Sequence, residues 1–149
     1  GAHVLAFDPA QPDLTIDPKH FRWASHAEIF READILTLHC PPSRDGKPLV
    51  NSEMLATVKP GLILVNTARA SLVDEAALMA ALDEKRLQTY CVDVFDPEPP
   101  AYPGLASRAD VIASSHIGGY TEESVNRATE MAIFNLLESL GLEQRARSA

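Results

Sequence analysis

Apolar residues gather in five short runs along the chain, and stretches with helical spacing separate them. The runs cover residues 4–7, 35–38, 62–65, 91–95 and 111–113. Each run is brief and apolar, and several contain β-branched residues, which is typical of buried strands. Continuous apolar strands that alternate with helices indicate a parallel sheet covered by helices on both faces. The pattern therefore predicts an α/β fold.

Each expected helix follows a side chain that can accept a hydrogen bond from the first backbone amides. The caps and ranges are Ser25 with Glu28 in a capping box, Asn51 or Ser52 before residues 53–57, Asp74 before residues 75–85, and Thr121 before residues 122–140. Helical spacing predicts a buried face in the last two helices. The inward residues are Leu78, Ala81 and Leu82 in one helix, and Val125, Ala128, Met131 or Ala132, and Leu136 in the other, which Gly141 ends.

Net charge and cysteine usage narrow the class of protein. A net charge of −8 is a poor match for nucleic acid or an anionic membrane surface. Cys40 and Cys91 lie far apart without a Cys-x-x-Cys pair, which predicts neither a metal site nor a disulfide framework. A length of 149 residues fits one domain, and a reducing cytoplasm fits the cysteine usage.

Loops at the carboxyl ends of the strands build the ligand crevice in open parallel sheets. This rule places Asp8, residues 39–41, residues 66–69 and the segment from Asp93 onward at one edge of the predicted sheet. We therefore expect a ligand to bind at that edge.

Two of these strand ends carry a charged side chain suited to a ligand. Asp8 can accept both hydroxyls of an adenosine ribose and would repel a 2′-phosphate; a turn or capping role before Pro9 is the alternative. The guanidinium of Arg69 matches a substrate carboxylate bidentately. For Arg69, the alternative is a surface ion pair with Asp74 or Glu75.

Two further candidates lie in the last third of the chain. Glu98 belongs to an acidic loop stiffened by prolines, which suits a carboxylate aimed at a partner, and simple solvation of the loop is the alternative. His116 stands between a strand and a long helix, beside Gly118 and Gly119, which let the backbone approach a ligand closely. Histidine suits acid–base chemistry near neutral pH, and a structural histidine in a glycine-rich turn is the alternative.

Taken together, three segments carry more information than any one of them. They are Thr67-Ala68-Arg69, Asp93-Val94-Phe95-x-x-Glu98-Pro99 and Ser115-His116-Ile117-Gly118-Gly119. In this order and spacing they resemble the D-isomer-specific 2-hydroxyacid dehydrogenase family, which includes phosphoglycerate dehydrogenase and hydroxypyruvate reductase. The resemblance runs from about residue 3 to residue 140, and it implies a Rossmann-type fold and NAD as the cofactor.

The resemblance also implies a role for each matching position. Arg69 would bind the substrate carboxylate and polarise the carbonyl. His116, paired with Glu98, would exchange a proton with the substrate hydroxyl. The implied cofactor contacts are Asp8 at the adenosine ribose, Cys40 on the adenine side, Thr67, Ala68 and Arg69 near the nicotinamide, Asp93 at the carboxamide, and His116, Ile117, Gly118 and Gly119 over the ring.

Two positions depart from the family pattern. Ala70 replaces the glycine that usually follows the arginine, and a backbone that required positive φ would be strained there. We expect the turn to adapt, because alanine is the smallest alternative. Tyr90 stands where the family generally has a small residue, which bears on local packing.

No Gly-x-Gly-x-x-Gly can be made from the seven glycines of the chain. In the family this loop follows the first strand and holds the cofactor pyrophosphate. We therefore expect residues 1–149 to be a partial NAD-binding and catalytic domain. It would be a doubly wound parallel sheet that lacks its first strand and glycine-rich loop, with the substrate domain elsewhere. In the strand order 3-2-1-4-5-6, residues 4–7 and 35–38 would then lie on one side of a gap and residues 62–65 with the later strands on the other.

The expected function is hydride transfer between NAD and C2 of a small 2-hydroxy or 2-keto acid. We expect the full protein to be a cytoplasmic homodimer that uses no metal ion and has no nucleic-acid or membrane partner. One alternative is a nucleotide-sensing, corepressor-like binding module of the same fold, and another is an inert fragment. The acidic balance favours the enzyme.

Overall fold

A computed structural model describes residues 1–101 and 103–142 of the chain. It contains two compact units, one covering Gly1–Ser115 and one that begins at His116. In chain order, the elements of the first unit are β1 (Val4–Ala6), β2 (Phe21–Trp23), α1 (His26–Glu32), β3 (Ile35–Leu38), α2 (Ser52–Leu55), β4 (Leu62–Asn66), the 3₁₀ turn η1 (Ala70–Leu72), α3 (Glu75–Asp83), β5 (Leu87–Val92), the 3₁₀ turn η2 (Leu105–Ser107) and β6 (Val111–Ala113).

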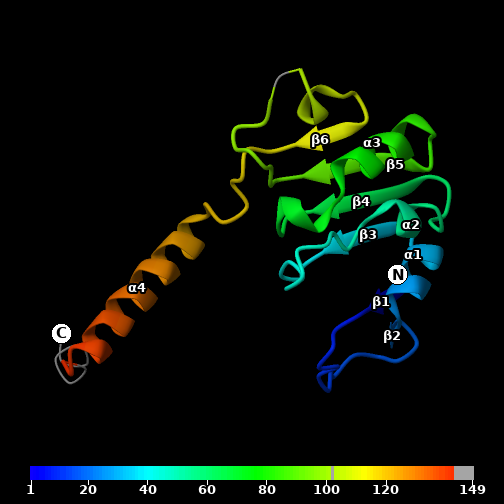
Figure 1. The fold of residues 1–149 in the computed structure, drawn as a ribbon. Helices are drawn as coiled ribbons and strands as arrows, with labels where there is room; N and C mark the ends of the chain where they lie inside the picture. The colour runs from blue at the N-terminus through cyan, green and yellow to red at the C-terminus, as the bar shows by residue number, and fades with distance from the viewer. Residues whose placement is uncertain (102, 143–149) are drawn as a thin grey trace. The chain divides into compact units, whose positions relative to one another are not determined.

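The strands pair in parallel and form two sheets (Figure 1). One sheet contains β1 and β2, and the other has the order β3-β4-β5-β6. This arrangement confirms the predicted α/β class. The predicted position of residues 35–38 is wrong, because β3 pairs directly with β4, with Ile35 opposite Ile63.

The strand that pairs with β1 was missed in the sequence. β2 is only three residues long and has Arg22 at its centre, so it shows no apolar run. Each of β1 and β3 has one strand partner, and in the described part of the chain no strand bonds to the other edge of either. The predicted interruption of the sheet therefore falls between β1 and β3 rather than after β3.

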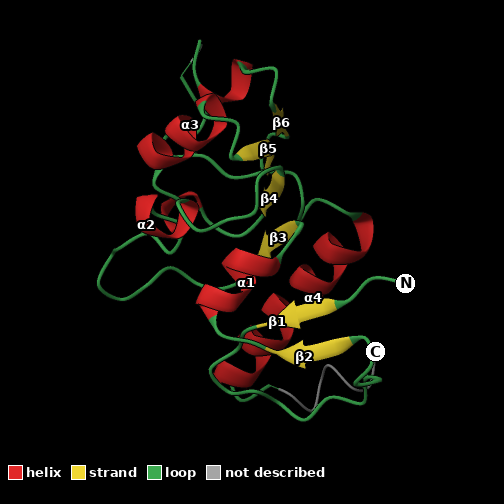
Figure 2. Ribbon diagram, turned by 90° about the vertical axis from the view of Figure 1, so that its right-hand side faces the viewer, coloured by secondary structure: helices red, strands yellow, loops and turns green. Residues whose placement is uncertain are grey.

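Within the first unit, helices cover one face of the β3–β6 sheet. Burial alternates along β4, with even-numbered residues buried and odd-numbered residues half-buried. α2 and α3 lie on the same face of this sheet (Figure 2), and their Leu55 and Leu78 belong to the buried core. The strand register places Ile35 and Ile112 on the other face, which Ile63 and Val65 of β4 share. Ile35 and Ile112 are 64% and 65% exposed. Within the first unit, α2 and α3 therefore cover one face of the sheet, and helices on the second face stay a prediction.

The predicted helix starts are confirmed, since a side chain accepts a hydrogen bond from a helix amide at each of them. The caps are Ser25 with Glu28 for α1, Asn51 for α2, Asp74 for α3 and Thr121 for the helix of the second unit. The predicted inward face of α3 is also buried, through Leu78, Ala81 and Leu82. Capping and helical spacing are local properties, which explains why the sequence predicted them well.

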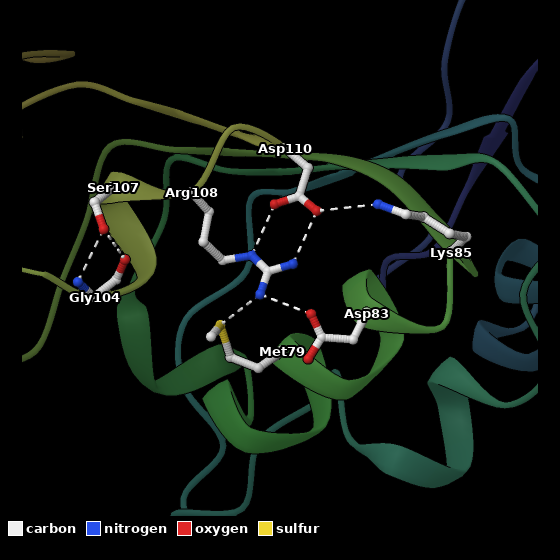
Figure 3. Close-up of polar contacts among 7 residues, drawn as sticks. All are labelled: Met79, Asp83, Lys85, Gly104, Ser107, Arg108 and Asp110. Carbon is white, nitrogen blue, oxygen red and sulfur yellow. Dashed lines mark hydrogen bonds and ion pairs between the residues drawn. The ribbon is translucent and has the colours of Figure 1, made fainter.

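An ion-pair network joins the end of α3 to the segment before β6 (Figure 3). The Arg108 guanidinium donates to both carboxylate oxygens of Asp110, at 2.8 and 2.9 Å, and lies 2.8 Å from the Asp83 carboxylate. Lys85 Nζ lies 3.8 Å from Asp110. The hydrogen bonds from Arg108 hold the pKa of the Asp110 carboxyl below its usual value.

The second unit is dominated by α4 (Glu122–Ser139), which begins after Thr121 and ends before Gly141 at φ +68°. Its predicted inward residues, Val125, Ala128, Met131, Ala132 and Leu136, are all exposed. Helical spacing identifies this apolar face without identifying what covers it, so its inward orientation stays a prediction. Across residues 1–101 and 103–142, no helix combines the length and apolar character needed to cross a membrane.

Candidate active site

The carboxyl ends of β3 and β4 meet at a groove that holds four of the predicted site residues. The groove has a volume of about 330 Å³, and its lining residues are His39, Cys40, Pro41, Pro42, Thr67, Ala68 and Arg69. Cys40 follows β3, and residues 67–69 follow β4, which pairs with β3 in parallel. The structure thus brings Cys40, Thr67, Ala68 and Arg69 together, as expected for loops at the carboxyl ends of parallel strands.

A buried amide shapes the turn that carries three of these residues. Asn66, the last residue of β4, is fully buried. Its Nδ2 donates to the Arg69 carbonyl at 2.9 Å, and its Oδ1 accepts from the Ala68 amide at 3.1 Å. Nδ2 also lies 3.3 Å from the Tyr90 hydroxyl, to which it donates. Buried polar groups are almost always bonded in this way, because an unsatisfied one costs about 1–3 kcal/mol.

Arg69 stands at the exposed rim of this turn. Its Nη1 donates to the Ala68 carbonyl at 2.6 Å. The alternative ion pair with Asp74 or Glu75 is not formed among the described residues, and the Asp74 carboxylate instead accepts from the Ala77 amide at 3.0 Å. The guanidinium is therefore available at the groove for an anionic ligand.

The turn adapts to Ala70, as predicted. Ala70 is not among the described non-glycine residues with positive φ, which are Gln11, Lys85 and His116. The chain passes instead from Arg69, at φ −147°, directly into the 3₁₀ turn η1. An alanine at this position therefore carries no left-handed strain.

Asp93 lies next along the sheet edge, one residue after β5. It is 5% exposed, and its Oδ1 accepts from the Ser114 hydroxyl at 2.6 Å. Its backbone amide donates to the Asn66 carbonyl at 3.1 Å, and the Ser114 amide donates to the Val92 carbonyl at 2.9 Å. A line of hydrogen bonds therefore connects the ends of β4, β5 and β6.

Glu98 folds back on its own loop. Its Oε1 accepts from the Phe95 amide at 2.9 Å, so one carboxylate oxygen is committed to the loop backbone. Glu98 is in the first unit, and His116 begins the second. The pairing of Glu98 with His116 therefore stays a prediction.

The turn that starts the second unit carries the remaining candidates. His116 has φ +57°, in the left-handed region that non-glycine residues seldom occupy. Ile117, Gly118 and Gly119 follow it and are exposed, and the Tyr120 amide donates to the Ile117 carbonyl at 2.9 Å. A non-glycine residue in this region is uncommon outside turns and functional sites.

Asp8 occupies the turn that its alternative interpretation described. It lies two residues beyond β1, and its Oδ1 accepts from the Ala10 amide at 2.7 Å. The exposed carboxylate has acceptor capacity left for a ligand, so the two interpretations are compatible. Among the described residues, no group of three or more His, Cys, Asp and Glu side chains is placed to hold a metal ion.

The sequence did not reveal the hydrogen bonds that Asn66, Tyr90 and Ser114 make at this edge of the sheet. A signal was present for Asn66, because it continues the alternation of Leu62 and Leu64 onto the buried face. Burial raises the pKa of Tyr90 to about 12, so its hydroxyl stays neutral at ordinary pH. The hydrogen bonds of Tyr90 and Ser114 join segments far apart in the sequence, so a local pattern does not predict them.

A parallel sheet with a polar groove at the carboxyl ends of its strands is the architecture of a dinucleotide-binding domain. The chain belongs to the D-isomer specific 2-hydroxyacid dehydrogenase family, whose NAD binding domain matches residues 1–118. The expected family, the Rossmann-like fold and the NAD-binding character of the domain are thereby confirmed.

Individual proteins resemble the chain over most of its length. It is 37% identical over 147 residues to (S)-sulfolactate dehydrogenase of Chromohalobacter salexigens, covering 95% of this chain and 47% of that protein. The structure of D-2-hydroxyisocaproate dehydrogenase matches with a TM-score of 0.81 at 27% identity, over 94% of this chain and 46% of that one. D-lactate dehydrogenase with NAD+ from Lactobacillus jensenii matches with a TM-score of 0.74 at 30% identity, over 89% and 44%. The chain thus spans about half the length of these relatives.

Proposed function

We propose that the protein to which this chain belongs is an NAD-dependent oxidoreductase that interconverts a small 2-hydroxy acid and its 2-keto acid. The observation that carries the proposal is the groove, which places the Arg69 cation beside Thr67, Ala68 and Cys40 within an NAD-binding family domain. Function resides in such a site rather than in the fold, which many activities share.

The residues present fit a dinucleotide along the carboxyl-end edge. Asp8 would hold the adenosine ribose, Cys40 would line the adenine side, and Thr67 with Ala68 would flank the nicotinamide. Asp93, which the Ser114 hydroxyl and the Asn66 carbonyl hold in place, would accept from the carboxamide. Bound NAD would supply the hydride-transfer chemistry, which no side chain of the protein offers.

Arg69 would bind the substrate. A guanidinium presents parallel donors that match both oxygens of a carboxylate, and it withdraws electron density from an adjacent carbonyl. Charge-assisted hydrogen bonds of this kind contribute about 1.5–3 kcal/mol each. The net charge of −8 repels an anionic substrate over long range, so a local cation of this type is required to hold it.

His116 would exchange a proton with the substrate oxygen, and the turn through Ile117, Gly118 and Gly119 would close over the nicotinamide ring. Glu98 would accept a hydrogen bond from the second imidazole nitrogen, which fixes the tautomer and the ring orientation. Reduction of the keto acid would then draw its proton from His116, and oxidation would return a proton to it. The homodimer and the cytoplasmic location belong to the same proposal.

The test uses the full-length protein, NADH and a panel of pyruvate, glyoxylate and hydroxypyruvate, with NADH absorbance as the signal. Arg69→Lys should raise KM for the preferred keto acid by roughly 10- to 100-fold, because a point charge replaces a bidentate fork. Arg31→Lys in α1, a matched change at an exposed site, should leave KM unchanged. NADH binding without turnover of any 2-keto acid would refute the enzyme and favour the corepressor-like module.

A further inference from the structure

Two polar side chains from neighbouring strands meet on the covered face of the β3–β6 sheet. Asn66 of β4 is fully buried, and Tyr90 of β5 is 2% exposed. In the strand register Leu64 opposes Tyr90 and Asn66 opposes Val92, so Asn66 and Tyr90 are diagonal neighbours on one face. The Asn66 Nδ2 donates to the Tyr90 hydroxyl at 3.3 Å.

The Asn66 amide controls the backbone on which Arg69 stands. One Nδ2 hydrogen is directed to the Arg69 carbonyl at 2.9 Å, and Oδ1 accepts from the Ala68 amide at 3.1 Å. The Arg69 guanidinium in turn donates to the Ala68 carbonyl at 2.6 Å. A rotation of the amide would therefore move both peptide groups that set the starting point and direction of the Arg69 side chain.

We propose that Tyr90 is a positioning residue for Arg69, acting through Asn66. An amide nitrogen has two hydrogens, and the Arg69 carbonyl satisfies only one of them. The Tyr90 hydroxyl gives the second hydrogen an acceptor inside the protein. Without the Tyr90 hydroxyl, one N–H of the buried amide has no acceptor. That cost destabilises the amide orientation that holds the turn.

The chemistry of the pair supports a fixed role rather than a switch. Burial raises the pKa of Tyr90 to about 12, so the hydroxyl remains a neutral acceptor throughout the working range. The Asn66 backbone carbonyl also accepts from the Asp93 amide at 3.1 Å. The same asparagine thus touches the backbone of the proposed substrate-binding residue and of a proposed cofactor-binding residue.

The proposal rests on the proposed function, and the experiment separates the two. In the full-length protein, Tyr90→Phe keeps the ring and removes only the hydroxyl. We expect kcat/KM for the best of pyruvate, glyoxylate and hydroxypyruvate to fall about three- to tenfold, the effect of one net hydrogen bond. We expect the Kd of NADH to change by a smaller factor than kcat/KM, because the proposed cofactor contacts of Asp8, Cys40 and Asp93 lie outside the Arg69 turn.

Amide hydrogen exchange gives a readout that needs no activity. The Ala68 amide should exchange at least about threefold faster in Tyr90→Phe, since its acceptor is loosened. Tyr120→Phe is the matched control, because Tyr120 is 80% exposed, and it should change neither exchange nor kinetics. If the wild type reduces none of the three keto acids, the proposed function fails while the exchange measurement still tests the positioning role.

Two outcomes overturn the positioning role. One is an Ala68 exchange rate in Tyr90→Phe equal to that of the wild type, whatever the activity. The other is a general loosening, in which exchange rises throughout β4 and β5 and the melting temperature falls, because that result assigns the hydroxyl to stability alone.

Discussion

Replacement of Asn66 by aspartate isolates the amide nitrogen that holds the Arg69 turn. The side chains have nearly the same size, but aspartate has an oxygen where Nδ2 donates to the Arg69 carbonyl at 2.9 Å. A protonated carboxyl can still donate one hydrogen bond to that carbonyl, whereas a carboxylate places its charge against it. The position is fully buried, so ionisation is opposed by desolvation as well.

The structure gives the size and the sign of the effect. Full burial raises the pKa of a carboxyl group above its unfolded value, and hydrogen bonds from the Ala68 amide and the Tyr90 hydroxyl offset part of that rise. Because the folded pKa lies above the unfolded pKa, the variant's stability is fully present below the unfolded pKa and is lost as pH rises through the folded pKa. At pH 7 the loss relative to the wild type should reach about 1–3 kcal/mol, the cost of leaving a buried hydrogen-bond partner unsatisfied.

Urea unfolding of the full-length protein and its variants from about pH 4 to pH 7 measures this difference. Asn51→Asp is the matched control. The Asn51 Oδ1 accepts from the Met54 amide at 3.0 Å as the cap of α2, and aspartate serves equally well there. Its difference from wild type should be small at every pH. A difference for Asn66→Asp that is constant with pH, or largest at pH 4, would refute the account of Asn66 as a buried donor.

The remaining predictions concern the ligand site and the surface network. Asp8→Ala should raise the ratio of kcat/KM with NADP to kcat/KM with NAD by roughly tenfold. An unchanged ratio would contradict the placement of Asp8 at the ribose. His116→Ala should lower kcat by about 10²–10⁴-fold. Glu98→Gln should lower kcat by a smaller factor, and an unchanged kcat in that variant contradicts their pairing. Arg108 holds the pKa of Asp110 low, so its stabilising effect is present above the unfolded carboxyl value and lost as pH falls through the lower folded value. Arg108→Ala should therefore lower the melting temperature more at pH 7 than at pH 3, and an equal loss at both contradicts the ion pair.

Local physics accounts for what the sequence predicted of the fold. A helix cap involves residues within one helical turn. The predicted caps, Ser25 with Glu28 in α1 and Asp74 in α3, are both present. The strand β2 was not predicted for the same reason. Phe21-Arg22-Trp23 contains no apolar run, and its pairing with β1 makes it a strand. That pairing joins residues 17 apart in the chain, such as Val4 and Phe21, and a local pattern of apolar positions does not detect it.

The same distinction between local pattern and strand pairing separates the site residues that the sequence could predict from those that it could not. Cys40 and Arg69 could be predicted to share an edge because parallel strands point their carboxyl ends the same way, and they do line one groove. Asn66 and Tyr90 could not be paired from the sequence, because the register between β4 and β5 determines which residues are diagonal neighbours. The register shifts between Leu62 and Ile63, so even a correct strand assignment would not have placed them.

Ala70 and Tyr90 both bear on the peptide group that carries the Arg69 carbonyl. Ala70 leads the chain into η1, whose Leu72 amide donates to the Arg69 carbonyl at 3.2 Å. The Asn66 amide, held by Tyr90, donates to the same carbonyl at 2.9 Å. An alanine whose φ suits the fold restricts the unfolded chain more than glycine does, and this stabilises a protein by about 0.4–1 kcal/mol. Ala70 limits the freedom of the unfolded backbone, and the proposed role of Tyr90 would add an anchor, so both residues would stiffen the turn that presents the Arg69 guanidinium.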